Sequence, residues 1–342
     1  MEEKKILLGM SGGIDSTYAV TELRRQGYEV VGAFLKMTQE SEEEPAVRAA
    51  TALGVPLTVV DCTERFRNIV IENFLSEYAA ARTPNPCIVC NRFVKIAVLC
   101  ETAKAMGISK IATGHYARIE KDEESGRYCV CKAVDPRKDQ SYMLWRLTQE
   151  QLSMLELPLG SLLKSEIKEK AQEMDLPNAN APESQEICFT DDYVSYIEER
   201  MGKFPKGDFT DEDGKPIGKH EGIIRYTVGQ RKGLGISLGR PAFVVSIDPA
   251  LHTIMLTSDE NKIFSDTLIC KDLNFMTLEP GDYESVSGEG KVRYAARPEE
   301  ANACIRGAEA RIVFGCRVRA VTPGQSVVFY RGDRVLFGGM IE

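Results

Sequence analysis

The feature that most constrains the fold is a glycine-rich stretch near the start of the chain, Gly9-Met10-Ser11-Gly12-Gly13-Ile14-Asp15-Ser16. It follows an apolar run at 6–8 and leads into residues 17–26, where apolar side chains recur at helical spacing. A strand, a glycine turn and a helix in this order direct free backbone N–H groups at an anion. The serines add hydroxyl donors, and Asp15 is placed to cap the helix or to help hold Mg²⁺. The stretch lacks both the Gly-Lys-Ser/Thr ending of a Walker A loop and a dinucleotide fingerprint.

This stretch resembles the Ser-Gly-Gly-x-Asp-Ser loop of the PP-loop ATP pyrophosphatases. Those enzymes grip the pyrophosphate of ATP and react at its α-phosphate. The plainer alternative is a turn that merely joins a strand to a helix. The specified positions, set between a strand and a helix, favour an ATP site.

Length and composition predict a multidomain globular protein. The chain has 342 residues, 43% hydrophobic and 27% charged, which suggests two or three domains. We expect a cytoplasmic protein without signal peptide or membrane partner, and reduced cysteines that serve catalysis or metal binding. The net charge is −8, yet residues 219–245 hold five Lys/Arg against one acid and residues 291–342 hold nine against five. Such local strips keep RNA binding possible, because charge acts over about 10 Å.

The order of apolar runs predicts the fold class, α/β. Strand-like runs alternate with helical ones up to about residue 202, which indicates a doubly wound parallel sheet with ligands at the carboxyl ends of its strands. Residues 119–134 read as a hairpin. Glycine then becomes frequent and short alternating runs replace the helices. We therefore expect a catalytic domain at 1–202, a small β-rich linking domain at 203–270 and a C-terminal β-barrel at 271–342.

A second motif reads Thr83-Pro84-Asn85-Pro86-Cys87-Ile88-Val89-Cys90-Asn91. Its prolines argue against a helix at this point, and the following run predicts a helix that starts near Asn91. Cys90 is then expected beside a helix N-terminus, with a lowered pKa. The alternatives are half of a zinc site or a thioredoxin pair. A zinc site would want a second cysteine pair nearby, and a thioredoxin motif would not follow two prolines.

Three further stretches carry polar groups that could serve a site. Cys188 ends a polar loop, Ala181-Pro182-Glu183-Ser184-Gln185-Glu186-Ile187-Cys188-Phe189, just before a helix expected at 192–200. An isolated cysteine is more often a small buried hydrophobic residue. A functional interpretation of Cys188 therefore depends on its acting together with Cys90. His115 follows a strand, where ligands bind, although a structural role is nearly as good an interpretation. Residues 138–141 read as a helix start exposed to solvent.

Taken together, these motifs resemble the bacterial tRNA-specific 2-thiouridylases, which are tRNA-uridine 2-sulfurtransferases. The resemblance extends over essentially the whole chain and is specific, because many motifs occur in order. Besides the stretches already quoted, it rests on Gly114-His115-Tyr116-Ala117-Arg118, Lys138-Asp139-Gln140-Ser141, Tyr226-Thr227-Val228-Gly229-Gln230-Arg231-Lys232-Gly233-Leu234-Gly235-Ile236, Arg293-Tyr294 and Thr322-Pro323-Gly324-Gln325-Ser326.

The resemblance implies ATP-dependent replacement of the 2-oxygen of the wobble uridine by sulfur. It implies ATP, with Mg²⁺, at Gly9, Met10, Ser11, Gly12, Gly13, Ile14, Asp15, Ser16, Leu35 and Gly114. The nucleophile would be Cys90 and the persulfide carrier Cys188. Asn85, Pro86 and Cys87 would frame the target base, and tRNA would contact His115, Lys138, Asp139, Gln140, Arg293, Tyr294 and Gln325. The implied partners are tRNA and a sulfur donor: a sulfur-relay protein, a cysteine desulfurase or free sulfide.

The chain departs from the family pattern at two places. Cys87 stands where many members have Asp, and residues 182–186 differ from the commoner Asp-Ser-x-Gly pattern. Cys87, Cys90 and Cys188 could therefore bind three irons of a [4Fe–4S] cluster whose fourth iron holds sulfide. This hypothesis and the persulfide route both use Cys90 and Cys188, and both stay open at this point.

Two other functions compete with thiolation. Another PP-loop adenylating ligase or amidotransferase, acting on a small molecule, would explain the ATP loop but leave Cys90, Cys188 and the β-rich tail without a role. A small metabolite that stimulates pyrophosphate release, with tRNA inert, would favour it. A tRNA-binding or sulfur-carrier protein with a degenerate ATP site is the other alternative, and the intact glycine-rich stretch argues against it.

Overall fold

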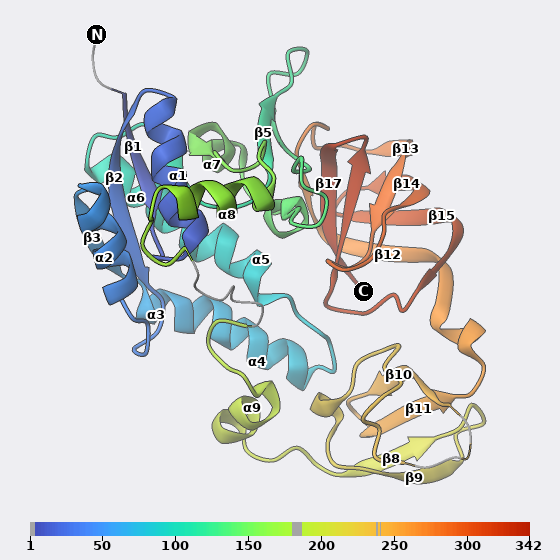
Figure 1. The fold of residues 1–342 in the computed structure, drawn as a ribbon. Coiled ribbons are helices and arrows are strands. Elements are labelled where there is room, and N and C mark those ends of the chain that lie inside the picture. Colours follow the sequence, from blue (N-terminus) through green and yellow to red (C-terminus); the bar gives the residue numbers. More distant parts are fainter. Residues whose placement is uncertain (1–3, 180–186, 237–238, 240) are drawn as a thin grey trace.

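The structure is a computed structural model that describes residues 4–179, 187–236, 239 and 241–342. Its N-terminal part is built on a parallel sheet of order β3-β2-β1-β4-β7, of which β1, β2 and β3 are labelled in Figure 1. The strands are β1 (Lys4–Gly9), β2 (Tyr28–Lys36), β3 (Leu57–Asp61), β4 (Ile111–Ala112) and β7 (Leu155–Glu156). The order of the strands reverses between β1 and β4. In doubly wound sheets this switch point is where ligands bind.

Helices cover both faces of this sheet, because its central strand is apolar on both sides. Ile6 and Leu8 belong to one core, whereas Leu7 between them belongs to another, and all three are fully buried. Such a continuous apolar run is typical of a buried parallel strand. The covering helices are α1 (Ile14–Arg25), α2 (Glu44–Leu53), α6 (Ile96–Ala105), α7 (Gln149–Met154) and α8 (Lys164–Glu173).

Two long helical segments lie between β3 and β4, and each contains a π-helical turn. The first comprises α3 (Thr63–Phe66), η1 (Arg67–Ile71) and α4 (Glu72–Ala79). The second comprises α5 (Pro86–Cys90), η2 (Asn91–Lys95) and α6. A short 3₁₀ turn, η3 (Ser141–Leu144), precedes α7. π-helical turns inside α-helices often occur at functional sites.

A small sheet follows helix α9 (Tyr193–Met201) and forms the middle domain. Its order is β10-β11-β8-β9, with a parallel pair at β11 and β8. The elements are β8 (Gly207–Thr210), β9 (Pro216–His220), η4 (Ile223–Arg225), β10 (Phe243–Asp248), β11 (Thr253–Thr257) and η5 (Glu260–Ile263). Phe209, Ile254 and Val244 are buried in its core, which also takes in α4 and α9 side chains.

The C-terminal strands close into a barrel, because β12 pairs with both β15 and β17. The strands are β12 (Phe264–Phe275), β13 (Tyr283–Lys291), β14 (Glu299–Arg306), β15 (Glu309–Arg319), β16 (Ser326–Arg331) and β17 (Arg334–Ile341). Phe329 and Phe337 stack inside it with ring centroids 5.1 Å apart.

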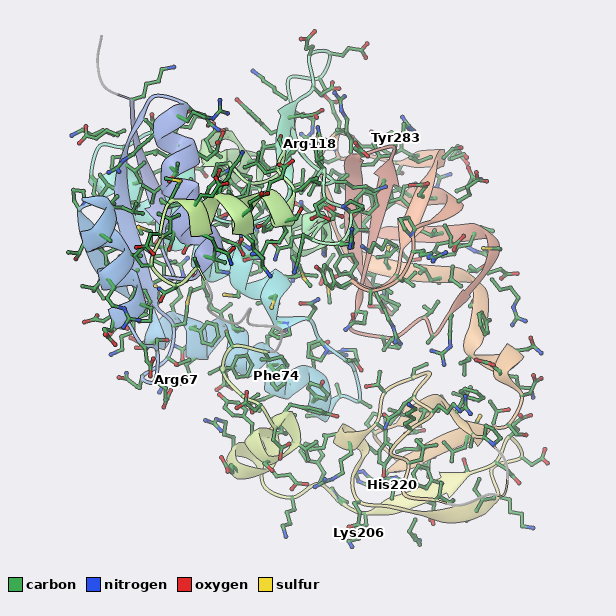
Figure 2. All side chains as sticks on the ribbon, in the orientation of Figure 1. Arg67, Phe74, Arg118, Lys206, His220 and Tyr283 are labelled. Carbon is green, nitrogen blue, oxygen red and sulfur yellow. The ribbon has the colours of Figure 1, made fainter. Side chains whose placement is uncertain are left out.

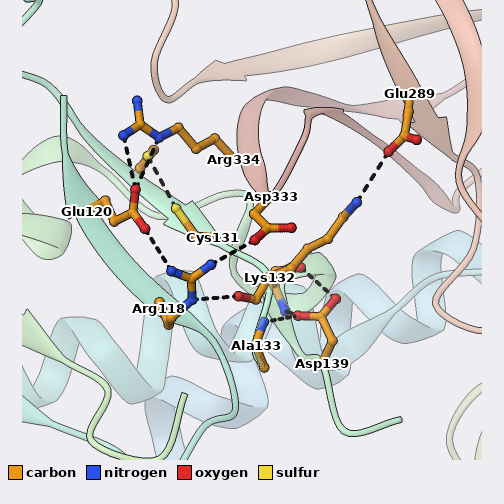
Figure 3. Close-up of polar contacts among 11 residues, drawn as sticks. Arg118, Glu120, Cys131, Lys132, Ala133, Asp139, Glu289, Asp333 and Arg334 are labelled. Atoms are coloured by element: carbon orange, nitrogen blue, oxygen red, sulfur yellow. Dashed lines mark hydrogen bonds and ion pairs between the residues drawn. The ribbon is translucent and has the colours of Figure 1, made fainter. Parts of the chain in front are cut away.

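A hairpin of the N-terminal domain extends the barrel sheet. Strands β5 (Arg118–Lys121) and β6 (Tyr128–Cys131) continue the order beyond β17. Ion pairs fasten the two parts together: Arg118 with Asp333 at 3.0 Å, Arg334 with Glu120 at 3.1 Å, and Lys132 with Glu289 at 3.2 Å (Figure 3).

The fold class expected from the sequence is confirmed. The parallel α/β sheet, the β-rich middle domain and the closed barrel are all present, as is the hairpin at 119–134. Two expectations about local structure are wrong. The helix after the second motif begins at Pro86, not near Asn91, because Pro86 takes the first helical position, where proline needs no N–H partner. The segment at 138–141 leads into a 3₁₀ turn.

Candidate active site

The glycine-rich loop joins β1 to the N-terminus of α1. Gly13 is the N-cap residue, and Gly12 has a φ of +80°. A Cβ atom on Gly12 would lie 2.3 Å from the carbonyl carbon of Pro45, so only glycine fits. The Ser16 hydroxyl donates to the carbonyl of Gly13 at 3.0 Å and lies 3.2 Å from the hydroxyl of Ser11. The loop thus presents a helix N-terminus and hydroxyl groups to an anion.

Asp15 in this loop is held by two side chains that the sequence analysis missed. Its carboxylate accepts hydrogen bonds of 2.5 Å from the hydroxyl of Tyr116 and from the ammonium of Lys164. The Lys164 side chain is 6% exposed and its nitrogen lies 5.5 Å from the centroid of the Tyr116 ring. The loop has no Lys or Arg of its own, so a cation for it must come from elsewhere in the chain. No motif around Lys164 identifies that residue as the source.

The other predicted ATP residues lie at the same edge of the sheet. Gly114 follows β4, and a Cβ atom on it would lie 3.1 Å from the backbone nitrogen of Ser16. Leu35 lies near the carboxyl end of β2, beside β1. The structure therefore brings together the predicted ATP residues from the ends of β1, β2 and β4.

The second motif forms a helix start with a capped first turn. Asn85 is the N-cap residue, and its side-chain oxygen accepts a hydrogen bond of 3.2 Å from the backbone nitrogen of Cys87. The side-chain nitrogen of Asn85 donates to the sulfur of Met143 at 3.5 Å. Cys87 is exposed, whereas Cys90 is buried one turn later.

The expectation for Cys90 is wrong in two respects. Cys90 lies one full turn inside the continuous helical segment that begins at Pro86, instead of beside its N-terminus, so the helix dipole favours its thiolate little. Burial raises the pKa of the Cys90 thiol to about 11, although the positive charge of Lys95 opposes this shift. Negative charge on Cys188 or Cys87 raises it further. Ile187 and Phe189, on either side of Cys188, pack against the same apolar cluster as Cys90.

Cys188 reaches this region because its neighbour Phe189 is anchored. The Phe189 ring meets Phe66 and Phe74 edge-on, at centroid distances of 5.7 and 5.2 Å, and packs against Tyr196 at 5.2 Å (Phe74 is labelled in Figure 2). Cys188 itself keeps an exposed surface, yet the surrounding protein desolvates its thiol and raises the pKa. The helix after it, α9, begins one residue later than predicted, with Asp192 as N-cap. The unusual residues 182–186 lie outside the described residues.

Lys95 is a further residue that sequence reasoning missed. Its positive charge opposes the burial that raises the pKa of both Cys90 and Cys188. It also lies near His115, where burial and the charge of Lys95 lower the pKa to about 3. His115 is therefore neutral at pH 7 and accepts or shares a 2.7 Å hydrogen bond with the hydroxyl of Thr113. The sequence signal that could have identified Lys95 is its position five residues after Cys90, in the helix predicted to follow that cysteine.

The predicted tRNA residues make several contacts within the protein. The carboxylate of Asp139 accepts hydrogen bonds from the backbone of Ala133 and Ser141, at 3.0 and 3.1 Å. The carboxamide oxygen of Gln140 accepts one from the backbone of Tyr116 at 2.9 Å. Lys138 lies partly exposed beside them. The bond from Tyr116 to Gln140 connects residues 138–141 to the end of β4, where Tyr116 also bonds Asp15 of the glycine-rich loop.

The predicted residues of the barrel fall into two groups. Tyr294 is 40% exposed, and the Lys291 ammonium lies 5.5 Å from its ring centroid. Arg293 and Gln325 instead reach other domains: Arg293 donates to the carbonyl of Val228 at 3.0 Å, and Gln325 donates to the carbonyl of Thr83 at 2.7 Å.

Within the described ranges, no three His, Cys, Asp or Glu side chains are grouped so that they could hold a metal ion. Cys87, Cys90 and Cys188 all lie within these ranges, so they do not form a ready ligand set. Among those same residues, no helix is both long and apolar enough to cross a bilayer.

Comparisons with known proteins agree along the entire chain. Residues 4–192 match the tRNA methyl transferase HUP domain, 194–258 the tRNA methyl transferase PRC-barrel domain, and 265–341 the aminomethyltransferase beta-barrel domain. The tRNA-specific 2-thiouridylase MnmA of Acetivibrio thermocellus is 46% identical, with all of both chains covered. Its namesake in Clostridioides difficile is 43% identical, with 99% of this chain and 98% of that protein covered. The chain belongs to the tRNA-specific 2-thiouridylase family.

Proposed function

We propose that this protein catalyses the ATP-dependent 2-thiolation of the wobble uridine in tRNA anticodons. The observation that carries the proposal is that Cys90 and the two neighbours of Cys188, Ile187 and Phe189, pack into one apolar cluster, although they are far apart in sequence. Cys90 belongs to a helix whose start is framed by Asn85 and Pro86, in the domain whose sheet edge bears the glycine-rich loop. A small-molecule ligase would need no such pair of thiols. The middle domain and the barrel supply surface for a macromolecular substrate.

The ATP site is formed by Gly9, Met10, Ser11, Gly12, Gly13, Ile14, Asp15 and Ser16, with Leu35 and Gly114. The α1 N-terminus and the Lys164 ammonium beside Asp15 offer positive potential to the pyrophosphate group. Mg²⁺ is commonly bound by one or two carboxylates together with substrate phosphates, and Asp15 fits that role. When bound, the ion would neutralise phosphate charge. Tyr116 and Lys164 orient the Asp15 carboxylate.

The reaction first makes the uridine oxygen a leaving group. The 2-oxygen attacks the α-phosphate of ATP, which forms an adenylated base and releases pyrophosphate. A persulfide on Cys188 then attacks C2 through its terminal sulfur, and AMP leaves with the original oxygen. The Cys90 thiolate attacks the inner sulfur on Cys188, which releases 2-thiouridine and leaves a Cys90–Cys188 disulfide. A dithiol reductant restores both thiols.

The target base and its tRNA are held by residues from two domains. Asn85, Pro86 and Cys87 frame the base, which must leave the anticodon stack at a cost of a few kcal/mol. His115, Lys138, Asp139, Gln140, Arg293, Tyr294 and Gln325 contact the tRNA. Tyr294 suits stacking on an unpaired base, because its ring is exposed beside Lys291. Since His115 is neutral, it acts as a hydrogen-bonding group there and not as a cation.

The iron–sulfur alternative has less support than the persulfide route. The described cysteines Cys87, Cys90 and Cys188 do not group as metal ligands, so they do not fit a preformed [4Fe–4S] site. The persulfide route needs only Cys90 and Cys188. In this account Cys87 replaces the commoner Asp without taking part in sulfur transfer.

The remaining parts of the proposal concern organisation and partners. We place the catalytic domain at 1–202 and start the linking domain at 203. The boundary expected between 270 and 271 falls inside β12, Phe264–Phe275, so the barrel is proposed to begin at Phe264. The sulfur donor is a sulfur-relay protein, a cysteine desulfurase or free sulfide, any of which can reach the exposed Cys188. The cytoplasm is the compartment in which uncharged tRNA, ATP and reduced thiols occur together.

Replacement of each cysteine tests this function. With tRNA, ATP and a polysulfide as sulfur source, wild-type protein is expected to form 2-thiouridine, measured by mass spectrometry of digested tRNA. Cys90→Ser and Cys188→Ser should abolish the product while tRNA-dependent pyrophosphate release persists, because adenylation needs neither thiol. Cys316→Ser, at an exposed thiol on the barrel, is the matched control and should keep activity. Pyrophosphate release that tRNA does not stimulate would contradict the proposal.

A further inference from the structure

A loop of the barrel, residues 322–325, grips the chain just before the Cys90 helix. We name residues 322–325 the clamp loop. The backbone nitrogen of Thr83 donates to the carbonyl of Pro323 at 2.9 Å. The side-chain nitrogen of Gln325 donates in return to the carbonyl of Thr83 at 2.7 Å, with the carbonyl of Pro84 at 3.4 Å. Thr83 is therefore fixed from both sides of its backbone by another domain.

The clamp loop fits this chain segment closely. Gly324 has a φ of +85°, and a Cβ atom on it would lie 2.8 Å from the Cβ of Arg82 and 2.9 Å from the backbone nitrogen of Thr83. Neither contact leaves room for a side chain. The middle domain joins the same point, because the hydroxyl of Thr227 lies 3.3 Å from that of Thr83. All three domains thus meet at Thr83.

The backbone between Thr83 and Cys90 has little conformational freedom. Pro84 and Pro86 have fixed φ angles, and Asn85 between them is the N-cap of α5. Pro86 starts the helix, and Cys90 ends its first full turn. A shift of Thr83 is therefore passed on to Asn85, Pro86 and Cys90 instead of being absorbed by a flexible loop.

We propose that Gln325 is a positioning residue for sulfur transfer, which acts by holding the Thr83 and Pro84 carbonyls so that the Cys90 helix is correctly placed. This inference rests on the proposed role of Cys90 and adds a function to the barrel. The barrel then serves the reaction itself, besides offering a surface to tRNA.

The same loop is linked to the exposed part of the barrel. Arg293 donates a hydrogen bond to the hydroxyl of Thr322 in the clamp loop and another to the carbonyl of Val228 in the middle domain. Its neighbour Tyr294 is exposed. A tRNA bound at Tyr294 is therefore adjacent to Arg293, whose hydrogen bond to Thr322 steadies the clamp loop. Binding of tRNA is in this way coupled to the placement of Cys90.

The experiment separates positioning from tRNA contact. Single-turnover formation of 2-thiouridine is measured at saturating ATP and tRNA, on enzyme preloaded with polysulfide, together with the Kd for tRNA. Gln325→Ala should lower the rate at least about tenfold, because misplacement of reacting groups by about 1 Å costs up to about a hundredfold. The Kd reports separately on loss of the direct contact between Gln325 and tRNA, and saturating tRNA keeps that loss out of the rate. Gly324→Ala, which pushes the clamp loop away without removing Gln325, should slow the reaction in the same way.

Controls keep the result interpretable. Asn302→Ala removes an exposed amide from β14 of the same barrel, where its partner is Ser287, and should leave rate and Kd unchanged. Equal thermal midpoints for the variants and the wild type show that folding is intact. A wild-type rate for Gln325→Ala at saturating tRNA would overturn the inference, whatever its Kd. Failure of the proposed function has a different signature, because the wild type would then form no 2-thiouridine at all.

Discussion

In the proposed sulfur transfer Cys90 must lose its proton before it attacks the persulfide, because the thiolate is the nucleophile. In the structure burial raises its pKa to about 11, and Lys95 is the cation placed to oppose that shift. The two residues lie on consecutive turns of one continuous helical segment, α5 and η2. The energetic cost of ionising Cys90 is thus part of the reaction, and burial in turn keeps water from the sulfur.

This predicts a pH dependence for sulfur transfer. A thiol with a pKa of about 11 is mostly protonated at pH 7. As long as the pH stays below that pKa, each rise of one pH unit increases the thiolate fraction about tenfold. The single-turnover rate of 2-thiouridine formation at saturating tRNA should therefore rise steadily from pH 7 to pH 9. Stopped reactions at each pH, analysed by mass spectrometry, measure it. A rate that is already flat across this range would show that Cys90 is ionised at neutral pH.

Helix starts and aromatic anchors decide where the sulfurs lie. The sequence predicts the helix after the cysteine motif but not its start. Prolines usually indicate a break in a helix, whereas Pro86 occupies the first helical position and starts one. Cys90 is buried in an apolar cluster that includes α4 and α9 side chains from segments distant in sequence, which local patterns do not report. Phe189 gave no signal either, because its partners Phe66 and Phe74 come from helices over a hundred residues earlier.

Removal of the Phe189 ring should uncouple the two cysteines. Phe189→Ala deletes contacts with three aromatic rings, so Cys188 should spend less time near Cys90. We expect oxidant-induced Cys90–Cys188 disulfide formation to slow at least about tenfold, followed by alkylation and peptide mass spectrometry. Phe189→Leu, which keeps apolar volume, should retain more of the rate. A disulfide that forms as fast in Phe189→Ala as in the wild type would show that the ring does not place Cys188.

At the scale of the whole molecule, the sequence predicts the domain types but not how they join. Apolar periodicity was enough for the parallel sheet and the barrel, since each strand carries its own pattern. The joins depend on single polar contacts between distant residues. Arg118 pairs with Asp333, and Gln325 reaches Thr83. Motif order pointed to Gln325 as a tRNA contact, whereas only the folded chain reveals its hydrogen bonds to the loop before Cys90.

The most direct test of the account is sulfur transfer by iron-free protein. The enzyme is purified without oxygen, its iron and acid-labile sulfide are quantified, Cys188 is loaded with polysulfide, and the protein is mixed with ATP and tRNA. The account predicts 2-thiouridine in the tRNA, a Cys90–Cys188 disulfide in the enzyme, and equal yields from wild type and Cys87→Ser, without stoichiometric iron. A product that requires a bound cluster, and is lost with Cys87→Ser, would contradict it.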